Sequence, residues 1–413
     1  MRRAAVLALL SLAMSNASFA TDPPSGKPLS GAALYADVQR YDSFGVHRYG
    51  SSGLDHALDW IADELKQAGL AVSSQPFSLH RQYDFKKATL TVDGQAHTVM
   101  PQWWLADSQA SFALTASIAP DGDALAPDAF VRALLPFDRG AYLNAQHRAA
   151  IERALARQPR AVLLTIDHPS GEIFTYNVAQ TDRAWQVPVI LVAPKDNAAL
   201  DAAQRSGQPV SLAVQGAMRR DVPGRNVVAR LDRGKGKWIV VSTPVSSWFT
   251  STCERAPGIA GFLALARLAT QGWPQADFVF VATSGHEIGH GGMEQFLHAG
   301  APKPEATVAW VHLGASLACN GAQRVILTSD AMESSVDRGF KGIDAARFVG
   351  AQAGVGELRE VLAAGYPRFF GMAGTHPYFH TPADRAAMTS PELLEPVTRS
   401  FAATVDEALA TTR

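Results

Sequence analysis

The spacing of hydrophobic positions predicts helices and buried strands over much of the chain. Apolar residues recur at helical spacing among charged ones in residues 54–68, and Gly69 ends the pattern, so we expect an amphipathic helix there. Beyond residue 226, continuous apolar runs at 238–241, 278–282 and 308–313 alternate with helical patterns at 258–270 and 293–298. This order predicts an α/β fold with a mixed, largely parallel sheet and helices on both faces.

The pattern changes between residues 105 and 220, where β-rich runs at 161–166 and 187–192 follow a helical pattern at 149–157. We interpret this region as an inserted, β-rich, lid-like domain. The predicted organisation is a signal peptide at 1–20, the first part of the main domain at 21–104, the insertion at 105–220 and the rest of the main domain at 221–413. Because ligands bind at the carboxyl ends of strands in such sheets, we expect the functional site after residues 241, 282 and 313 and near the loop at 374–384.

The overall composition is that of a globular protein. The chain has 413 residues, of which 47% are hydrophobic and 18% charged, and this length suits two domains or one large domain with an insertion. Its 37 basic and 38 acidic residues give a formal net charge of -1. Such a balance argues against nucleic acid or an anionic membrane as a partner.

The first twenty residues have the pattern of an export signal. Arg2 and Arg3 precede an apolar run at 4–14, and small residues ending at Ala20 form a cleavage site. That run is too short to span a bilayer and no later stretch is long enough, so we expect a soluble periplasmic or secreted protein. Cys253 and Cys319 are the only cysteines, and a pair is compatible with a disulfide in an oxidising compartment.

Residues 286–290 read H-E-x-x-H, a string that binds zinc when one helix carries both histidines. Here a buried strand pattern ends at residue 282, and four glycines between 285 and 292 oppose a helix. We therefore favour a loop at the end of a strand, in which Glu287 alone matters, over a zinc-binding helix that carries His286 and His290.

Two further segments offer candidate chemistry. The loop at 374–384 holds two histidines and an aspartate among prolines, which suits a stiff ligand-holding loop and equally a surface turn. His376 and Tyr378 of this loop are candidate substrate-binding residues. Glu254, just before a predicted helix, fits a metal ligand or an acid stabilised by the positive helix end. Its neighbour Cys253 fits a structural or disulfide-bonded cysteine better than a nucleophile, because no base is identified for it.

Taken in order, these segments resemble the M28 family of zinc exopeptidases, which includes aminopeptidases and glutaminyl cyclases. The family's R-x-x-G-S and L-x-x-x-G-L opening is similar to residues 47–51 and 64–70, and the lead-in to its first metal segment is similar to 226–241. Residues 285–289, G-H-E-I-G, stand where the family has G-E-E-x-G, and 379–384, F-H-T-P-A-D, match its F-H-T-P-x-D. The insertion resembles, more weakly, a protease-associated domain.

The resemblance implies a reduced metal site. The His and Asp that hold only the first zinc of the two-zinc members correspond to Pro244 and Gly314, which cannot bind metal. The ligands of the second zinc correspond to Glu254, Glu287 and His380. Three protein ligands with an open position for water suit a single catalytic zinc ion.

The resemblance also implies the remaining roles. His286 replaces the family's catalytic base, and imidazole can accept a proton near neutral pH. Ser246 replaces an Asp that orients the lost metal ligand. Because the family places two of its strand ends near the active site, Cys253 and Cys319 are expected to lie close together and to form a disulfide.

Three functions follow from these residues. The first is a metallohydrolase that uses one zinc ion to cleave peptide or small amide substrates, as an aminopeptidase does. The second is a catalytically inactive relative that binds peptides or other partners, and the third is acyl transfer of the glutaminyl-cyclase kind. Bound metal distinguishes the first from the second, and consumption of water distinguishes hydrolysis from cyclisation.

Overall fold

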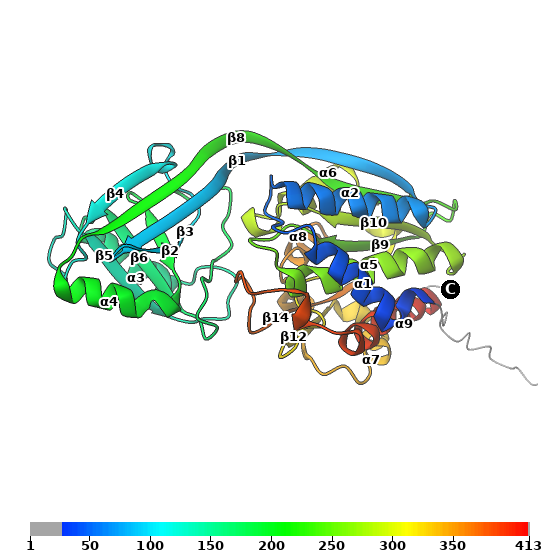
Figure 1. Ribbon diagram of the computed structural model, residues 1–413. Helices are drawn as coiled ribbons and strands as arrows, with labels where there is room; N and C mark the ends of the chain where they lie inside the picture. Colours follow the sequence, from blue (N-terminus) through cyan, green and yellow to red (C-terminus); the bar gives the residue numbers. More distant parts are fainter. Residues whose placement is uncertain (1–26, 412–413) are drawn as a thin grey trace, which may run out of the picture.

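The computed structural model describes residues 27–411, which form a main lobe and a small lobe joined by two long strands (Figure 1). The predicted signal peptide lies outside the described residues. One sheet has ten strands and extends from the main lobe into the small lobe. A second sheet of four strands lies in the small lobe. No helix within residues 27–411 is both long enough and apolar enough to cross a membrane.

The apolar runs of the sequence form the centre of the ten-stranded sheet. β9 (Trp238–Pro244) pairs in parallel with β10 (Asp277–Thr283) on one side and with β11 (Thr307–Leu313) on the other. β11 pairs in parallel with β14 (Phe369–Thr375), which pairs in the antiparallel direction with β12 (Gln323–Thr328), and β13 (Ala346–Val349) forms the edge. The predicted mixed, largely parallel α/β sheet is therefore confirmed.

Helices cover both faces of this sheet. Alternate residues of β10 enter different cores, since Phe278 and Phe280 belong to one buried cluster and Val279 and Val281 to another. The first core is covered by α1 (Gly31–Asp42), α2 (Ser52–Gln67), α5 (Thr252–Gln271), α7 (Glu333–Gly339) and α9 (Pro391–Ala410). The second core is covered by α6 (Gly291–Ala299) and α8 (Leu358–Ala363).

Two strands of 22 residues each connect the lobes. β1 (Ala71–Val92) and β8 (Val210–Leu231) pair in the antiparallel direction along almost their whole length and arch from one lobe to the other (Figure 1). At the small-lobe end they pair with β2 (Gln95–Thr98) and β4 (Phe112–Ala116).

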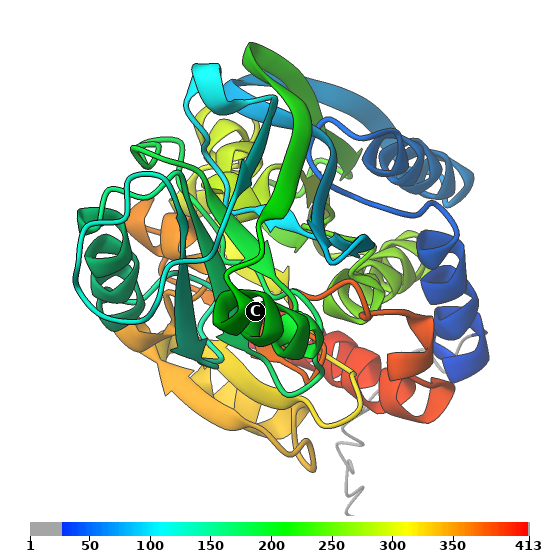
Figure 2. The ribbon, with the colours of Figure 1, turned by 60° about the vertical axis from the view of Figure 1, so that its left-hand side comes forward.

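The rest of the small lobe is a short, mainly parallel sheet with two helices, seen at the front in Figure 2. Its strands are β3 (Met100–Pro101), β7 (Val189–Val192), β6 (Ala161–Asp167) and β5 (Phe130–Pro136), and its helices are α3 (Ala145–Ala156) and α4 (Asn197–Ser206). β3 precedes residue 105, so the small lobe also uses residues before the expected insertion. The division at 104 and 220 and the protease-associated character of the insertion stay predictions.

Short 3-10 helices complete the described part of the chain. They are η1 (Lys27–Leu29), η2 (Asp107–Gln109), η3 (Pro194–Asp196), η4 (His286–Ile288), η5 (Pro304–Ala306), η6 (Asp330–Met332), η7 (Gly350–Ala353) and η8 (Ala386–Met388). Of these, η4 directly follows the carboxyl end of β10 and carries the first part of the H-E-x-x-H string.

Candidate functional site

A cavity of about 460 Å³ lies at the carboxyl ends of the central strands, where ligands bind in sheets of this kind. We call it the strand-end cavity. Much of its lining is apolar, with Val325, Val355 and Phe379 among the contributors. Its buried polar side chains are Asn177, Glu254, Arg255, His286, His312 and His380.

The first turn of α5 brings Glu254 and Arg255 to this cavity. The leading N–H groups of a helix lack partners within the helix. The Asp384 carboxylate accepts two of them, from Cys253 at 2.7 Å and Glu254 at 3.0 Å. A residue of the proline-rich loop therefore fixes the start of α5, and with it the position of Glu254.

Glu254 and Arg255 form an ion pair that is almost completely buried. Arg255 Nη2 lies 2.8 Å from Glu254 Oε1, and each side chain is only 1% exposed. The guanidinium is oriented by its Nε, which donates to the carbonyl of Ser246 at 2.8 Å. Burial alone would raise the pKa of Glu254, but the charge of Arg255, followed by the charge and contact of His380 and the charge of His286, lowers that pKa to about 2. Glu254 is therefore a carboxylate whose charge is already balanced.

His380 approaches the same carboxylate from the loop after β14. Its Nε2 lies 3.5 Å from Glu254 Oε1, while its Nδ1 donates to the carbonyl of Thr175 at 2.9 Å. The structure thus brings two of the three predicted metal ligands together.

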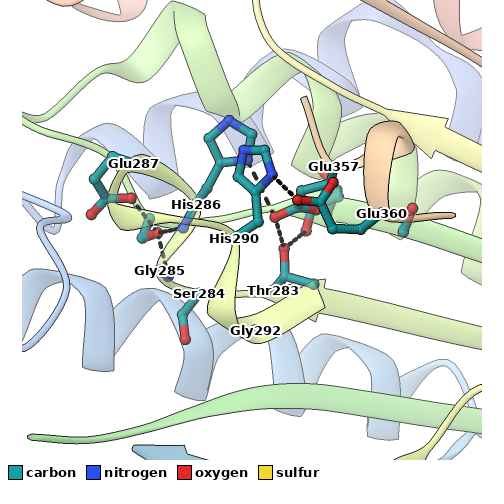
Figure 3. Close-up of polar contacts among 12 residues, drawn as sticks. Thr283, Ser284, Gly285, His286, Glu287, His290, Gly292, Glu357 and Glu360 are labelled. Carbon is teal, nitrogen blue, oxygen red and sulfur yellow. Dashed lines mark hydrogen bonds and ion pairs between the residues drawn. The ribbon is translucent and has the colours of Figure 1, made fainter. Parts of the chain in front are cut away.

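The third predicted ligand, Glu287, is held by other groups. Its Oε1 accepts the N–H of Tyr49 at 3.2 Å, and its Oε2 accepts the hydroxyl of Ser246 at 2.6 Å. Burial raises the pKa of Glu287, although these hydrogen bonds oppose the shift. Figure 3 shows its carboxylate pointing away from His286 and His290, and Glu287 is not part of the cavity lining.

The two histidines of the H-E-x-x-H string each contact an acid of the α8 region. His286 Nδ1 lies 3.2 Å from Glu357 Oε1, and His290 Nδ1 lies 3.1 Å from Glu360 Oε1 (Figure 3). No single helix carries both rings, because η4 ends at Ile288 and the backbone is left-handed at Gly289 and His290. The expectation of a loop rather than a zinc-binding helix is confirmed.

His286 is the member of this group that lines the cavity. A carboxylate only accepts hydrogen bonds, so the contact with Glu357 places the imidazole proton on Nδ1 and leaves Nε2 able to accept one. Burial, followed by the charge of Arg255, lowers the pKa of His286 well below its ordinary value. The ring is therefore a neutral, oriented proton acceptor.

A segment of the small lobe covers the site. Residues 173–178 are all buried and contact the main lobe at several points. Trp248 Nε1 donates to Asn177 Oδ1 at 2.9 Å, and the N–H of Val178 donates to the Glu287 carbonyl at 3.0 Å. The cavity is consequently built by both lobes.

The loop residues His376 and Tyr378 are not among those that line the cavity. His376 is buried behind it, with Nδ1 3.0 Å from Ser316 Oγ and Nε2 3.4 Å from Asp384 Oδ1. This position suits support of the capping Asp384, and a substrate-binding role for His376 and Tyr378 stays a prediction.

A disulfide joins Cys253 to Cys319, with 5.8 Å between their Cα atoms. The predicted pairing is present. The bond connects the first turn of α5 to the loop after β11, so it fixes the backbone beside Glu254.

Comparison with solved structures identifies the architecture. No protein-family model matches the sequence, and no curated protein does. A zinc aminopeptidase from Bacillus subtilis matches with a TM-score of 0.71 and 16% identity, over 92% of this chain and 95% of that one. A peptidase M28 precursor from Shewanella amazonensis matches with a TM-score of 0.67 and 16% identity, over 92% and 96%. A glutaminyl cyclase from Fimbriiglobus ruber gives 0.51 and 11%, over 92% and 96%. The chain has the zinc-exopeptidase fold.

The zinc-exopeptidase fold raises the question whether these residues fit a zinc ion. A catalytic zinc is held by at least three His, Cys, Asp or Glu side chains. Within residues 27–411 no group of three such side chains is arranged to hold a metal ion. Glu254 is neutralised by Arg255 and Glu287 is bound elsewhere, so the residues do not fit the expected three-ligand zinc site. The assignment of Glu254, Glu287 and His380 as ligands stays a prediction that rests on the resemblance of the sequence.

Sequence reasoning missed several residues that line or support the strand-end cavity. Arg255 follows Glu254 directly but was given no role, because nothing local indicates that its side chain turns back into the core. His312 lies at the end of β11, with Nδ1 2.9 Å from Ser242 Oγ, and burial lowers its pKa to about 4. The strand-end rule pointed to this position and could have found it. Asn177 and Glu357 lie on distant segments and carry no local signal.

Proposed function

We propose that this protein is an exported peptide- or amide-binding protein of the zinc-exopeptidase fold, and that it binds its ligand without zinc. The observation that carries the proposal is the buried Glu254–Arg255 pair, which puts a fixed cation against the carboxylate expected to hold the metal. Export is supported by the N-terminal sequence pattern and by the disulfide, which persists in oxidising compartments.

The shape and chemistry of the cavity support a small organic ligand or the end of a peptide. Ligand sites are concave, largely apolar and supplied with a few polar groups that fix orientation. The strand-end cavity has this character and a volume of about 460 Å³. Both lobes contribute to it, through Asn177 on one side and Glu254 on the other.

A second candidate is metal-independent hydrolysis or acyl transfer on the bound amide. It is favoured by His286, whose contact with Glu357 leaves Nε2 as a proton acceptor at the cavity. A base held by a second acidic group is a common arrangement for activating water or another nucleophile.

The test combines metal analysis, binding and turnover on the full exported chain. Protein purified without chelator is analysed for zinc, and peptide binding is measured by calorimetry before and after chelator treatment. Release of product is followed on N-terminal aminoacyl amides and on glutaminyl peptides. We expect no stoichiometric zinc, unchanged binding after chelation and no turnover. One zinc per chain with chelator-sensitive hydrolysis would overturn the proposal, and metal-free turnover that His286→Ala abolishes would establish the second candidate.

A further inference from the structure

A second hollow lies beside the strand-end cavity, between the two lobes. Its volume is about 260 Å³, and the charged residues that line it are Arg148, Arg183, Arg359 and Asp182. It adjoins a groove of about 570 Å³, with which it shares Arg148, Asp182 and Arg183. We call this hollow the arginine pocket. The strand-end cavity alone leaves it without a role.

Two of its arginines carry a charge that the chain does not balance. The side chains of Arg148 and Arg183 form no hydrogen bond and no ion pair within residues 27–411. Arg148 Cζ lies 5.7 Å from the centroid of the Trp185 ring. An aromatic ring attracts and orients a guanidinium but does not neutralise it, and its N–H groups stay free to donate. Both arginines are exposed, so a ligand in the pocket can reach them.

The other charges near the pocket largely have partners. Arg359 Nη2 lies 2.8 Å from Glu360 Oε1, so this cation is paired. The Asp182 carboxylate accepts a backbone N–H at 2.8 Å, and Arg81 donates to the carbonyl of the same residue. Glu152 lines the groove but not the pocket. The two unpaired arginines therefore make the pocket a site for an anion.

The arginine pocket and the strand-end cavity share a wall. Tyr142 and Asn177 line both of them. An isolated backbone bridge joins these two residues, and the Tyr142 hydroxyl lies 3.0 Å from His290 Nε2, so the wall is held in place. Tyr142 is 40% exposed. A ligand can therefore extend over its ring from the cavity into the pocket.

We propose that the arginine pocket binds the carboxylate of a peptide whose other part occupies the strand-end cavity. The anionic groups of a peptide are carboxylates, and a guanidinium binds a carboxylate through charge-assisted N–H···O bonds. Arg148 and Arg183 supply the donors, while the neighbouring part of the peptide packs against the rings of Trp185 and Tyr142. The carboxylate belongs to the C-terminus or to an acidic side chain. This inference rests on the proposed binding function and adds a second subsite with its ligand chemistry.

The test uses two matched pairs of tripeptides on the full exported chain. The first pair is Leu-Ala-Phe with a free C-terminal carboxylate and the same peptide as its C-terminal amide. The second pair is Leu-Ala-Glu amide and Leu-Ala-Gln amide, which differ only in the acidic side chain. Calorimetric titration measures each affinity. We expect the charged member of at least one pair to bind at least about tenfold more tightly than its neutral partner, and that pair identifies the source of the carboxylate.

Salt and two variants locate the preference. The advantage of the charged peptide should shrink as salt rises from about 0.05 M to about 0.5 M, because salt screens exposed charges. The double variant Arg148→Gln/Arg183→Gln should bring the charged and neutral peptides to within about threefold of each other and leave the affinity of the neutral ones unchanged. Arg153→Gln removes an equally exposed charge from α3, outside the pocket and the groove, and should keep the full preference.

Each outcome separates this inference from the proposed function. Equal affinities within both pairs, or a preference that the double variant keeps, would overturn the arginine pocket while peptide binding still held. Failure of every peptide to bind would overturn the proposed function itself.

Discussion

Glu254 and Glu287 are both fully buried acids that the sequence assigns to one metal ion, and the structure gives them opposite surroundings. Glu254 faces the cation Arg255, and its pKa is lowered to about 2. Glu287 accepts hydrogen bonds from Ser246 and Tyr49, and burial raises its pKa although these bonds and the charge of Arg255 oppose the shift. A motif position therefore fixes the type of side chain but not its charge, because the charge depends on groups supplied by other segments.

The largest expected effect comes from removing the cation on the Glu254 side. Arg255→Met leaves the Glu254 carboxylate buried without its counter-charge, and breaking such a pair costs about 3–5 kcal/mol of unfolding free energy. Urea denaturation measures the loss. The matched double variant Glu254→Gln/Arg255→Met removes both charges and should recover most of it, and a double variant as unstable as the single one would contradict the ion-pair interpretation.

The next effect concerns the disulfide that fixes the same region. Replacing Cys253 and Cys319 by alanine opens a link between residues 66 apart in sequence, for which about 2–4 kcal/mol is typical. The loss should be local to the Glu254 side. Hydrogen exchange should accelerate at the amides of residues 253 and 254, which donate to Asp384, and stay unchanged at residues 285 and 286. Equal acceleration on both sides would show that the disulfide does not act locally.

A smaller loss is expected on the Glu287 side. The Ser246 hydroxyl donates to Glu287 and accepts the N–H groups of Gly285 and His286. Ser246→Ala leaves these buried groups without that partner, which costs about 1–3 kcal/mol for an unsatisfied group. Thermal unfolding measures the change, and Ser43→Ala on the exposed end of α1, whose hydroxyl donates to the Arg40 carbonyl, is a matched control with little expected effect. A Ser246→Ala variant as stable as this control would mean that Glu287 has other partners.

The sequence predicted those parts of the fold that depend on local pattern. The apolar runs at 238–241, 278–282 and 308–313 became β9, β10 and β11, because a strand buried on both faces must be continuously apolar. The full length of the β1–β8 pair was not predicted, since its middle part is largely exposed or half-buried and lacks an apolar pattern. In that middle part the two segments form strands because they pair with each other.

The candidate site was harder to predict for a related reason. The helix expected from Gly258 begins at Thr252, because Asp384, 130 residues after Glu254, accepts its first N–H groups. The direction of Glu287 depends on Tyr49 and Ser246, and the role of Arg255 depends on its side chain turning toward Glu254. Such long-range contacts leave no local signal, so the residues of the site were partly identified but their arrangement was not.

The pH dependence of stability compares the two acids most directly, because their opposite pKa shifts give stability opposite slopes with pH. The pKa of Glu254 is lower in the fold than in the unfolded chain, so the unfolded chain binds more protons between about pH 4.5 and 2, and stability falls as pH falls through that window. The pKa of Glu287 is raised in the fold, so the folded chain holds its proton longer, and stability falls as pH rises above about 4.5 until Glu287 ionises in both states.

Each group contributes at most about 1.4 kcal/mol per pH unit within its window. The Glu287 contribution is isolated by the difference in unfolding free energy between the unmodified protein and Glu287→Gln, measured by urea denaturation from pH 4 to 7. Relative to Glu287→Gln, the unmodified protein should lose unfolding free energy as pH rises, and the difference should then become constant. For Glu254, the unmodified protein should lose unfolding free energy relative to Glu254→Gln/Arg255→Met as pH falls below 4.5. Parallel slopes for the two comparisons would mean that both acids share one electrostatic environment, as two ligands of a common metal ion would.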